Sequence, residues 1–335
     1  MWPVKIGKIP AQILERTILP LTGSRRSEVL VGPRFGEDCA VLDLKDNLLV
    51  LSTDPITGAT KDLGHLAVHI SCNDVAATGA EPVGLLFSLL LPPGTGEESI
   101  RGLMEEIHQT AQALEVAVLG GHTEITPVVT QVVITSTAIG KVRGEHLVTS
   151  SGAQAGDDII LTKSAGLEGT AILAQELAAY LTPLLPPATL RAARALSEKI
   201  SVVPEGIIAA RAGATAMHDV TEGGLRGALV EVATASQVGL EIWEKNIPYA
   251  PATLAICRQL KIDPLSLISS GAMLITAPPG CPVLGSLRDA AIPATIIGKV
   301  TSQPGLILRG KKGEKEPITA PERDELYRAL EEYGL

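Results

Sequence analysis

The sequence predicts an α/β protein of two domains, and three observations support this prediction. The chain has 335 residues, which at roughly 100–200 residues per domain favours two domains over one. Hydrophobic residues make up 45% of the chain and charged residues 19%, so buried cores can form. Short apolar runs typical of strands alternate along the chain with longer segments of helical periodicity.

The first half of the chain is expected to mix strands with two long helices. Its strand-like runs are rich in Val, Ile, Leu and Thr, and its helical segments repeat apolar residues every three or four positions. The expected strands are 39–44, 48–53, 83–91, 116–119 and 128–140, and the expected helices are 61–79 and 97–115.

The second half begins after a small, polar segment, Thr149–Gly156, whose composition is typical of a linker. We therefore expect an N-terminal domain of residues 1–152 and a C-terminal domain of residues 153–335. In the second domain helices should cover a sheet. Its expected strands are 158–162, 272–276 and 294–300, and its expected helices are 169–179, 188–199, 205–212, 222–237, 252–260 and 283–290.

Charge and cysteine content exclude several classes of protein. The net charge is −9, so the chain lacks the basic surface of a nucleic-acid-binding protein. The four cysteines lie far apart, which indicates neither a zinc site nor a disulfide framework. The most apolar stretch, Leu85–Leu91, is far shorter than the ~20 residues of a membrane span, and charged residues run through the first twenty positions. We expect a cytoplasmic protein with no membrane contact.

Motifs of several familiar enzyme classes are missing from the sequence. The Gly-Lys pairs lack the flanking residues of a Walker loop, and no dinucleotide-binding glycine pattern is complete. There is no G-x-S-x-G segment and no H-E-x-x-H segment. These absences disfavour a classical nucleotide hydrolase, a nicotinamide enzyme, a serine hydrolase and a zinc protease.

Five segments of small residues present acids or a histidine, four of them near the ends of apolar elements and one inside a helix. Several oxygen ligands on separate segments suit Mg²⁺, which binds through one or two carboxylates together with substrate phosphates. Glycine-rich turns allow backbone N–H groups to approach phosphates. The segments are Gly36–Val41, Ser52–Asp54, Asn73–Ala80, Gly120–Glu124 and Asp219–Gly224.

Each segment also has a purely structural interpretation. Asp38 could close a turn, Asp54 could be an exposed residue at a strand end, and His122 could be an ordinary loop histidine. Asp74 differs because its small apolar neighbours predict burial, which is costly for a carboxylate without a metal ion or hydrogen-bond donors. Asp219 could be the N-cap of a helix that includes Glu222, in a capping box. The same helix start could bind phosphate.

The order of these motifs resembles the superfamily of aminoimidazole ribonucleotide (AIR) synthetase. This PurM-like superfamily also contains thiamine-monophosphate kinase, selenophosphate synthetase, formylglycinamidine ribonucleotide synthetase and the hydrogenase maturation factor HypE. The matching motifs span both halves of the chain in the family order. They are G-x-D-x-A-V at Gly36–Val41, S-T-D at Ser52–Asp54, the run His69–Pro82, G-G-x-T at Gly120–Thr123, and D-x-T-x-G-G at Asp219–Gly224.

The resemblance implies a fold, a cofactor and a set of site residues. The N-terminal domain would pair with its twin in a homodimer whose two sheets form a barrel, beside a C-terminal α/β domain. MgATP would bind in the cleft between the domains. By similarity, Asp38, Asp54 and Asp74 would be the catalytic, magnesium-binding residues. The nucleotide would be bound by Gly36, Asn73, Gly120, Gly121, Thr123, Asp219, Gly223 and Gly224.

Within the superfamily, the second domain is most similar to the HypE-like branch. The run Met217–Leu225 and the segment Gly239–Ile242 follow that branch. HypE itself ends in a cysteine that carries a carbamoyl group, whereas this sequence ends at Leu335 without one. His122 stands where relatives have an acid, with Glu124 nearby, and Gly166–Gly169 replaces a Gly-Asp-His sequence.

The resemblance therefore predicts ATP-dependent phosphorylation of an amide, carboxylate or phosphate oxygen. The substrate would be a small molecule or would be carried by a protein, and a partner in metallocentre (hydrogenase) maturation is expected. Two alternatives stay open. One is a non-catalytic, nucleotide-binding assembly factor, and the other is a small-molecule kinase similar to thiamine-monophosphate kinase.

Overall fold

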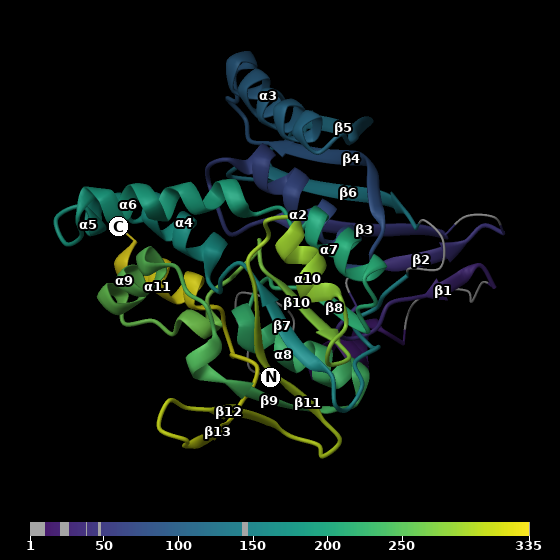
Figure 1. Cartoon of the computed structure of the whole chain (residues 1–335). Helices are drawn as coiled ribbons and strands as arrows, with labels where there is room; N and C mark the ends of the chain where they lie inside the picture. The colour runs from purple at the N-terminus through teal and green to yellow at the C-terminus, as the bar shows by residue number, and fades with distance from the viewer. Residues whose placement is uncertain (1–10, 21–26, 38, 46–47, 143–146, 335) are drawn as a thin grey trace.

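The computed structural model describes residues 11–20, 27–37, 39–45, 48–142 and 147–334 (Figure 1). Asp38, one of the expected metal-binding residues, lies outside the described residues. Each half of this part of the chain contains a sheet covered by helices, which confirms the α/β class. Among the helices described, none combines the length and the apolar character that crossing a membrane requires.

The first half contains a sheet of six described strands in the order β1-β2-β3-β6-β4-β5. Its neighbouring strands are antiparallel except β4 and β5, which run parallel and are joined by helix α3 (Glu97–Ala113). A crossover helix is the usual connection between parallel neighbours. The strands are β1 Val29–Val31, β2 Ala40–Asp43, β3 Leu48–Ile56, β4 Glu81–Leu91, β5 Ala117–Ile125 and β6 Val133–Lys141, and the chain before them holds α1 Ala11–Ile13 and the π-helix η1 Leu14–Ile18.

Helix α2 (Leu63–Ala77) is the central helix of the molecule. It packs on β3 and β6 on one side and on α7 (Val203–Arg211) of the second half on the other. Contact on opposite sides explains why its residues are buried nearly all round, polar ones included. Helix α3 lies outside α2 and, in contrast, has one buried stripe and one exposed face.

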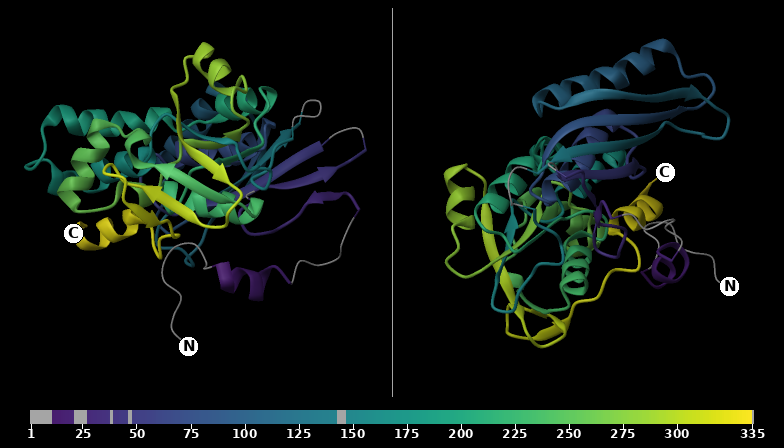
Figure 2. Two further views of the ribbon diagram at one scale, coloured as in Figure 1. Left: turned by 60° about the horizontal axis from the view of Figure 1, so that its bottom comes forward. Right: turned by 90° about the vertical axis from the view of Figure 1, so that its right-hand side faces the viewer.

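One face of the first sheet is covered and the other is open within the chain. Along β4, Leu85, Phe87 and Leu89 are buried, while Leu86 and Ser88 between them are exposed, as the alternation of side chains in a strand requires. Edge strand β5 is exposed along its whole length. Figure 2 shows α3 running along one side of these strands. The buried residues of β4 share a core with Ile107 and Ala111 of α3, so Leu86 and Ser88 face away from it.

The second half contains a sheet of seven described strands in the order β13-β12-β9-β11-β7-β10-β8. The pairing is antiparallel except between β12 and β9. The strands are β7 Asp158–Thr162, β8 Ala216–Asp219, β9 Gly239–Trp243, β10 Met273–Ala277, β11 Ala294–Thr301, β12 Leu306–Arg309 and β13 Lys315–Pro317.

Helices cover both faces of this second sheet. Ile159 of β7 packs with helix α8, and the next residue, Ile160, points to the opposite face, which α7 and α10 cover. A further group of helices, α4, α5, α6, α9 and α11, shares a core of its own. Apart from α7, the helices are α4 Leu167–Glu176, α5 Ala178–Leu181, α6 Pro187–Arg194, η2 Ala195–Lys199, α8 Gly224–Ser236, η3 Glu244–Asn246, α9 Pro251–Leu260, η4 Pro264–Ser266, α10 Val283–Asp289 and α11 Glu325–Tyr333.

Two structural expectations are wrong. The Gly120–Glu124 segment is not a loop after a strand but part of β5, where Gly120 and Gly121 adopt extended backbone with φ of +137° and +140°. Asp219 is not the N-cap of a capping box, because it ends strand β8 and the helix begins five residues later with Gly223 as its N-cap. In both cases the segment pairs with a strand from elsewhere in the chain, and a local sequence pattern does not predict such pairing.

Candidate functional site

A pocket at the junction of the two domains brings together carboxylates from both. We call it the acidic pocket; its cavity volume is about 140 Å³. From the first domain it is lined by the end of β3, the following loop and α2, and from the second domain by residues of four separate segments. The described lining is Asp54, Pro55, Ile56, Thr57, Gly58, Ala59, Leu66, Ile70, Asp74, Glu168, Thr221, Glu222, Ile268, Ser270 and Tyr327.

Asp54 and Asp74, two of the expected metal residues, lie together in this pocket. Asp54 belongs to β3, which runs through Pro55 to Ile56 and pairs with β6 along its length. Asp74 is on α2 and only 2% exposed, and its Oδ2 accepts a hydrogen bond of 2.5 Å from the Ser52 hydroxyl. The sheet and the helix packed on it thus bring the two carboxylates to one wall.

Burial and negative charge at Asp74 affect a neighbouring group. Burial, together with the charge of Asp74, raises the pKa of the Cys72 thiol to about 12. A thiol with so high a pKa is protonated at neutral pH and is a poor nucleophile. None of the four cysteines of the sequence lines the acidic pocket, and Cys39, Cys72 and Cys257 are buried.

The opposite wall comes from the second domain and is also acidic. Glu168 of α4 is 3% exposed, and burial raises the pKa of its carboxyl group. Its Oε2 accepts a hydrogen bond of 3.3 Å from the backbone N–H of Ser270. Glu222 lies in the turn before α8, and the Tyr327 hydroxyl of α11 donates to its Oε2 over 3.5 Å. The described lining of the pocket contains four carboxylates and no Lys, Arg or His.

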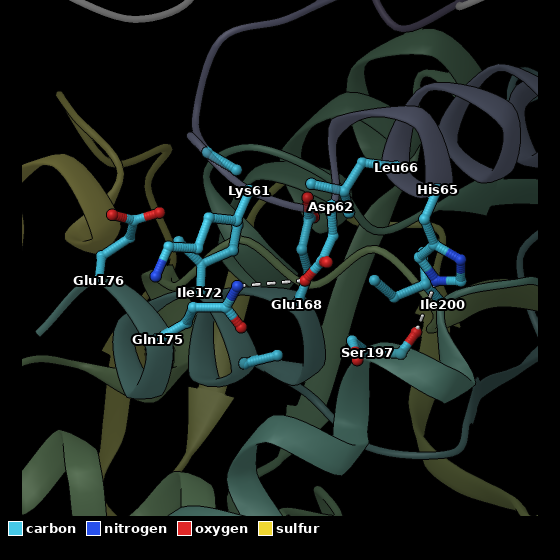
Figure 3. Close-up of a pocket in the computed structure, with 12 residues that line it drawn as sticks. Lys61, Asp62, His65, Leu66, Glu168, Ile172, Gln175, Glu176, Ser197 and Ile200 are labelled. Atoms are coloured by element: carbon cyan, nitrogen blue, oxygen red, sulfur yellow. Dashed lines mark hydrogen bonds between the residues drawn. The ribbon is translucent and has the colours of Figure 1, made fainter. Parts of the chain in front are cut away.

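A second, smaller pocket adjoins the acidic pocket and shares Ala59, Leu66 and Glu168 with it. Figure 3 shows this side pocket, with Lys61 and Asp62 of the first domain facing Gln175 and Glu176 of α4. The Gln175 amide donates to Asp62 over 3.2 Å. These contacts hold the loop between β3 and α2 against the second domain.

The same loop is fixed at a further point. The Thr60 hydroxyl and backbone N–H both donate to Glu176 Oε1, at 2.8 and 3.3 Å. On the far side of the side pocket, His65 Nε2 lies 3.1 Å from the Ser197 carbonyl oxygen (Figure 3). The loop that forms one wall of the acidic pocket is therefore positioned by side chains from both domains.

Asn73, which was expected to bind the nucleotide, instead contacts the backbone of the second domain. It is fully buried, its amide N–H donates to the Ile200 carbonyl over 2.8 Å, and its amide oxygen accepts from the Val202 backbone N–H over 2.8 Å. It is not among the residues that line the acidic pocket. In this structure the Asn73 amide joins α2 to the second domain.

The glycine segment of β5 lies on the same row of the sheet as Asp54 but away from the pocket. Asp54 pairs with Ser136, Ser136 with Phe87, and Phe87 with Gly121. Three strand spacings of ~4.8 Å place Gly121 about 14 Å from Asp54. Gly120 and Thr123 are exposed beside it. So are His122 and Glu124, whose Nε2 and Oε2 atoms lie 3.1 Å apart, within hydrogen-bond distance.

The remaining expected residues border the second domain. Gly36, with a φ of +81°, packs against the Glu231 carbonyl of α8. Asp219 is fully buried at the end of β8 and is followed by the pocket residues Thr221 and Glu222. The N–H of Gly223 donates to Asp324 over 2.6 Å, and the N–H of Gly224 donates to the Thr221 carbonyl over 3.0 Å.

The acidic residues of the second-domain wall were not among the site residues predicted from the sequence. Glu168 has a signal in the sequence, because it is an acid among small and apolar residues at a helix start next to Gly166. Tyr327 has no such signal, since an aromatic residue on an amphipathic helix is normally part of the core.

The two halves of the chain match two family models in the order expected. Residues 36–142 match the N-terminal domain of AIR synthase related proteins, and residues 154–311 match their C-terminal domain. Together these matches cover well over half of the chain. The chain belongs to the AIR synthase related family. The PurM-like fold that the sequence motifs predicted is thereby confirmed.

Among curated proteins, this AIR synthase related chain is similar to hydrogenase maturation proteins. A hydrogenase expression/formation protein of Methanocaldococcus jannaschii is 29% identical over 278 residues, 80% of this chain and 79% of the relative. The carbamoyl dehydratase HypE of Cupriavidus necator is 30% identical over 236 residues, 68% of this chain and 64% of the relative. The expected HypE-like resemblance is confirmed.

Solved structures show the same fold. HypE of Escherichia coli superposes with a TM-score of 0.73 at 25% identity, over 84% of this chain and 88% of HypE. A HypE–HypF complex has a TM-score of 0.73 at 21% identity, over 85% of this chain and 93% of the matched chain. A HypE in complex with ATP has a TM-score of 0.69 at 22% identity, over 94% of this chain and 95% of the matched chain. A ThiL complexed with AMPPCP and TMP has a TM-score of 0.69 at 20% identity, over 85% of this chain and 90% of the matched chain.

The donor set of the acidic pocket fits a hard cation that is shared with phosphates. Within the described residues, no group of three or more acidic, histidine or cysteine side chains could bind a metal ion by itself. Asp54 and Asp74 offer carboxylate oxygens, and Mg²⁺ commonly completes its coordination with water and substrate phosphates. The pair therefore suits Mg²⁺ that arrives with a nucleotide.

Proposed function

We propose that this HypE-like protein uses MgATP to phosphorylate an oxygen of an acceptor bound in the acidic pocket. The observation that carries the proposal is the arrangement of Asp54 and Asp74 on one wall, facing Glu168 and Glu222 on the other, at the junction of the two domains. A HypE of the same fold has been solved in complex with ATP, which supports nucleotide binding by this chain.

In this proposal Asp54 and Asp74, with Asp38, hold Mg²⁺, and the remaining nucleotide contacts come from Gly36, Asp219 and the glycines of β5 and α8. When bound, Mg²⁺ neutralises phosphate charge and orients the transferring group. The Ser52 hydroxyl holds the Asp74 carboxylate in place through its hydrogen bond. The loop at Thr57–Ala59 closes the pocket on the first-domain side.

The charge of the pocket favours an uncharged acceptor. Glu168 and Glu222 can accept hydrogen bonds from an N–H or O–H group, and no described cationic side chain lines the pocket to offset a second anion. A carboxamide offers an N–H donor and an oxygen nucleophile in one group. We therefore propose an amide oxygen as acceptor in preference to a carboxylate or phosphate oxygen, in a small molecule or on a protein partner.

The names of the relatives support a role in metallocentre maturation. Relatives are named hydrogenase expression/formation protein and carbamoyl dehydratase HypE, and one matched structure is a HypE–HypF complex. We propose that this chain likewise acts with a maturation partner that delivers or receives the acceptor. The ThiL structure with AMPPCP and TMP supports the alternative of a small-molecule kinase.

A homodimer would complete the site. The open face of the first sheet and the exposed β5 strand are the surfaces that a twin subunit could cover, and β5 carries Gly120, Gly121 and Thr123. With two copies joined there, these residues would lie at the subunit interface. We propose that they reach the nucleotide in that setting.

Isothermal titration with MgATP, together with ADP release over a panel of carboxamides, carboxylates and phosphate esters, tests the proposal. We expect micromolar MgATP binding that EDTA abolishes, and ADP release that only carboxamides stimulate. Binding without stimulated turnover would instead favour a non-catalytic assembly factor. Stimulation by phosphate esters would favour the kinase, and no MgATP binding at all would defeat all three hypotheses.

A further inference from the structure

Asp324 makes three backbone hydrogen bonds to three separate segments of the second domain. Its Oδ2 accepts from the N–H of Gly223 over 2.6 Å, and its Oδ1 accepts from Ile268 over 3.2 Å and from Leu326 over 2.8 Å. The side chain is 2% exposed. One carboxylate thus joins the turn before α8, the segment after η4 and the first turn of α11.

Each of the three segments supplies a residue to the acidic pocket. Glu222 directly precedes Gly223, Ile268 is itself a lining residue, and Tyr327 directly follows Leu326. The segments are distant in sequence, and Asp324 is a side chain that contacts all of them. The Tyr327 hydroxyl in turn donates to Glu222, which closes a ring of contacts around the second-domain wall.

We propose that Asp324 is a positioning residue for the acidic pocket, whose carboxylate keeps Glu222, Ile268 and Tyr327 in one arrangement. The inference rests on the proposed function only in taking this pocket as the acceptor site. Asp324 does not line the pocket and touches no reacting group. It acts through the backbone of the residues that do.

A helix N-cap alone does not account for these contacts. Asp324 is the N-cap of α11, and capping needs only the bond to Leu326. The bonds to Gly223 and Ile268 lie outside the helix. Gly223 and Gly224 both have positive φ, and a Cβ on Gly224 would lie 2.6 Å from the Leu265 carbonyl oxygen. The turn therefore fits closely against the segment before Ile268, and Asp324 joins the two.

Loss of the proton from Asp324 should weaken this arrangement, because a carboxyl group whose pKa is raised by burial binds its proton more tightly in the closed arrangement than in an opened one. Burial raises the pKa of Asp324 to about 7, and the charge of Glu222 adds to the rise. Six other charged residues on the elements around it form ion pairs with one another. These pairs are Glu325 with Arg328, Arg323 with Glu331, and Arg226 with Asp263.

Hydrogen exchange at single amides tests the proposal in the full-length protein. In Asp324→Asn, we expect protection to fall about tenfold or more at the amides of Gly223, Ile268 and Leu326. The amides of strand β10 should keep their protection. The matched control is Asp157→Asn, which removes another buried carboxylate of the second domain, one that accepts from the Gln154 N–H over 2.9 Å. It should leave Gly223 unchanged. Loss at Leu326 alone, or equal loss across the second domain, would overturn the proposal.

The wild-type protein provides a test that does not depend on the variant folding. Protection factors at Gly223 and Ile268 should fall as the pH rises from about 5 to 7 and level off above 7, whereas those of β10 should not. A flat profile would overturn the proposal. A wild type that binds no MgATP would defeat the proposed function and leave the exchange result standing.

Discussion

Asp54 and Asp74 show how much a residue's surroundings decide its role. Sequence analysis singled out Asp74 because small apolar neighbours predict burial, and the structure places it at 2% exposure beside the Ser52 hydroxyl. Asp54 had no such signal of burial, yet β3 continues past it and carries it into the same pocket. Both are oxygen donors on rigid elements, which suits a cation site that must be preformed.

We expect Asp54→Asn and Asp74→Asn each to weaken MgATP binding about tenfold or more, because each removes a negative ligand and keeps side-chain volume. Isothermal titration measures the change, and circular dichroism checks the fold. Asp43→Asn is the control, since this aspartate ends β2 in an exposed turn where it accepts from Lys45. Wild-type affinity in both site variants would show that other residues bind the metal.

Asp324 should make stability depend on pH in a direction unusual for an aspartate. Burial raises its pKa to about 7, so the folded state binds an extra proton between about pH 4 and pH 7. The contribution of this group is therefore favourable below pH 4 and is lost as the pH rises through 7. Relative to Asp324→Asn, we expect wild-type unfolding free energy to fall with pH across this window, by up to about 1.4 kcal/mol per unit. Urea titrations at several pH values measure it, and parallel pH profiles would contradict it.

At the scale of elements, periodicity predicted those whose environment is uniform along their length. The long helices α2 and α3 and the strands β4 and β7 follow the pattern of apolar residues. Strands β1, β8, β9, β12 and β13 and helix α11 were not predicted, because they are short or lie at sheet edges, where partners from elsewhere in the chain decide the structure.

The site follows the same division. The first-domain acids belong to motifs contained within a few residues, so they can be identified from the sequence alone. The second-domain wall joins Glu168, Glu222 and Tyr327, which lie 54 and 105 residues apart in the chain and meet only through tertiary packing. The same holds for Asp324, whose three hydrogen bonds exist only once α11 has docked on the domain.

Strand β5 depends on two glycines for different reasons, which a matched pair of variants can separate. Both have φ near +140°, but a Cβ on Gly121 would lie 1.8 Å from the Phe87 carbonyl oxygen, whereas a Cβ on Gly120 would meet nothing within 4 Å. Gly120→Ala should cost about 1–3 kcal/mol of backbone strain. Gly121→Ala should cost at least about 2 kcal/mol more, because β5 must move away from β4. Urea unfolding measures both, and equal costs would contradict the close approach.

At the scale of the whole molecule, the first sheet has one face that nothing in the described chain covers. At its centre, polar and apolar side chains lie side by side on neighbouring strands: Thr53 pairs with Thr137, and Thr137 pairs with Leu86. The Thr53 and Thr137 hydroxyls lie 2.9 Å apart. The Leu119 side chain of β5, which lies against Gly84 of β4, is exposed near this row. A half-apolar face next to an exposed edge strand is what a second copy of the sheet could cover.

We expect the protein to be a C2 homodimer joined through this face, with a mass in solution twice the 34.9 kDa of one chain. Because the face combines leucines with hydroxyl groups and carries few charges, the dimer should persist at high salt, where surface ion pairs are screened. Leu86→Arg puts a charge at the centre of the face and should yield monomers by light scattering at micromolar concentration. Leu254→Arg, on an exposed leucine of α9, is the control and should leave the dimer intact. A wild-type mass of one chain at low and high salt would rule out the dimer. It would also rule out the proposal that the β5 glycines bind the nucleotide at the subunit interface.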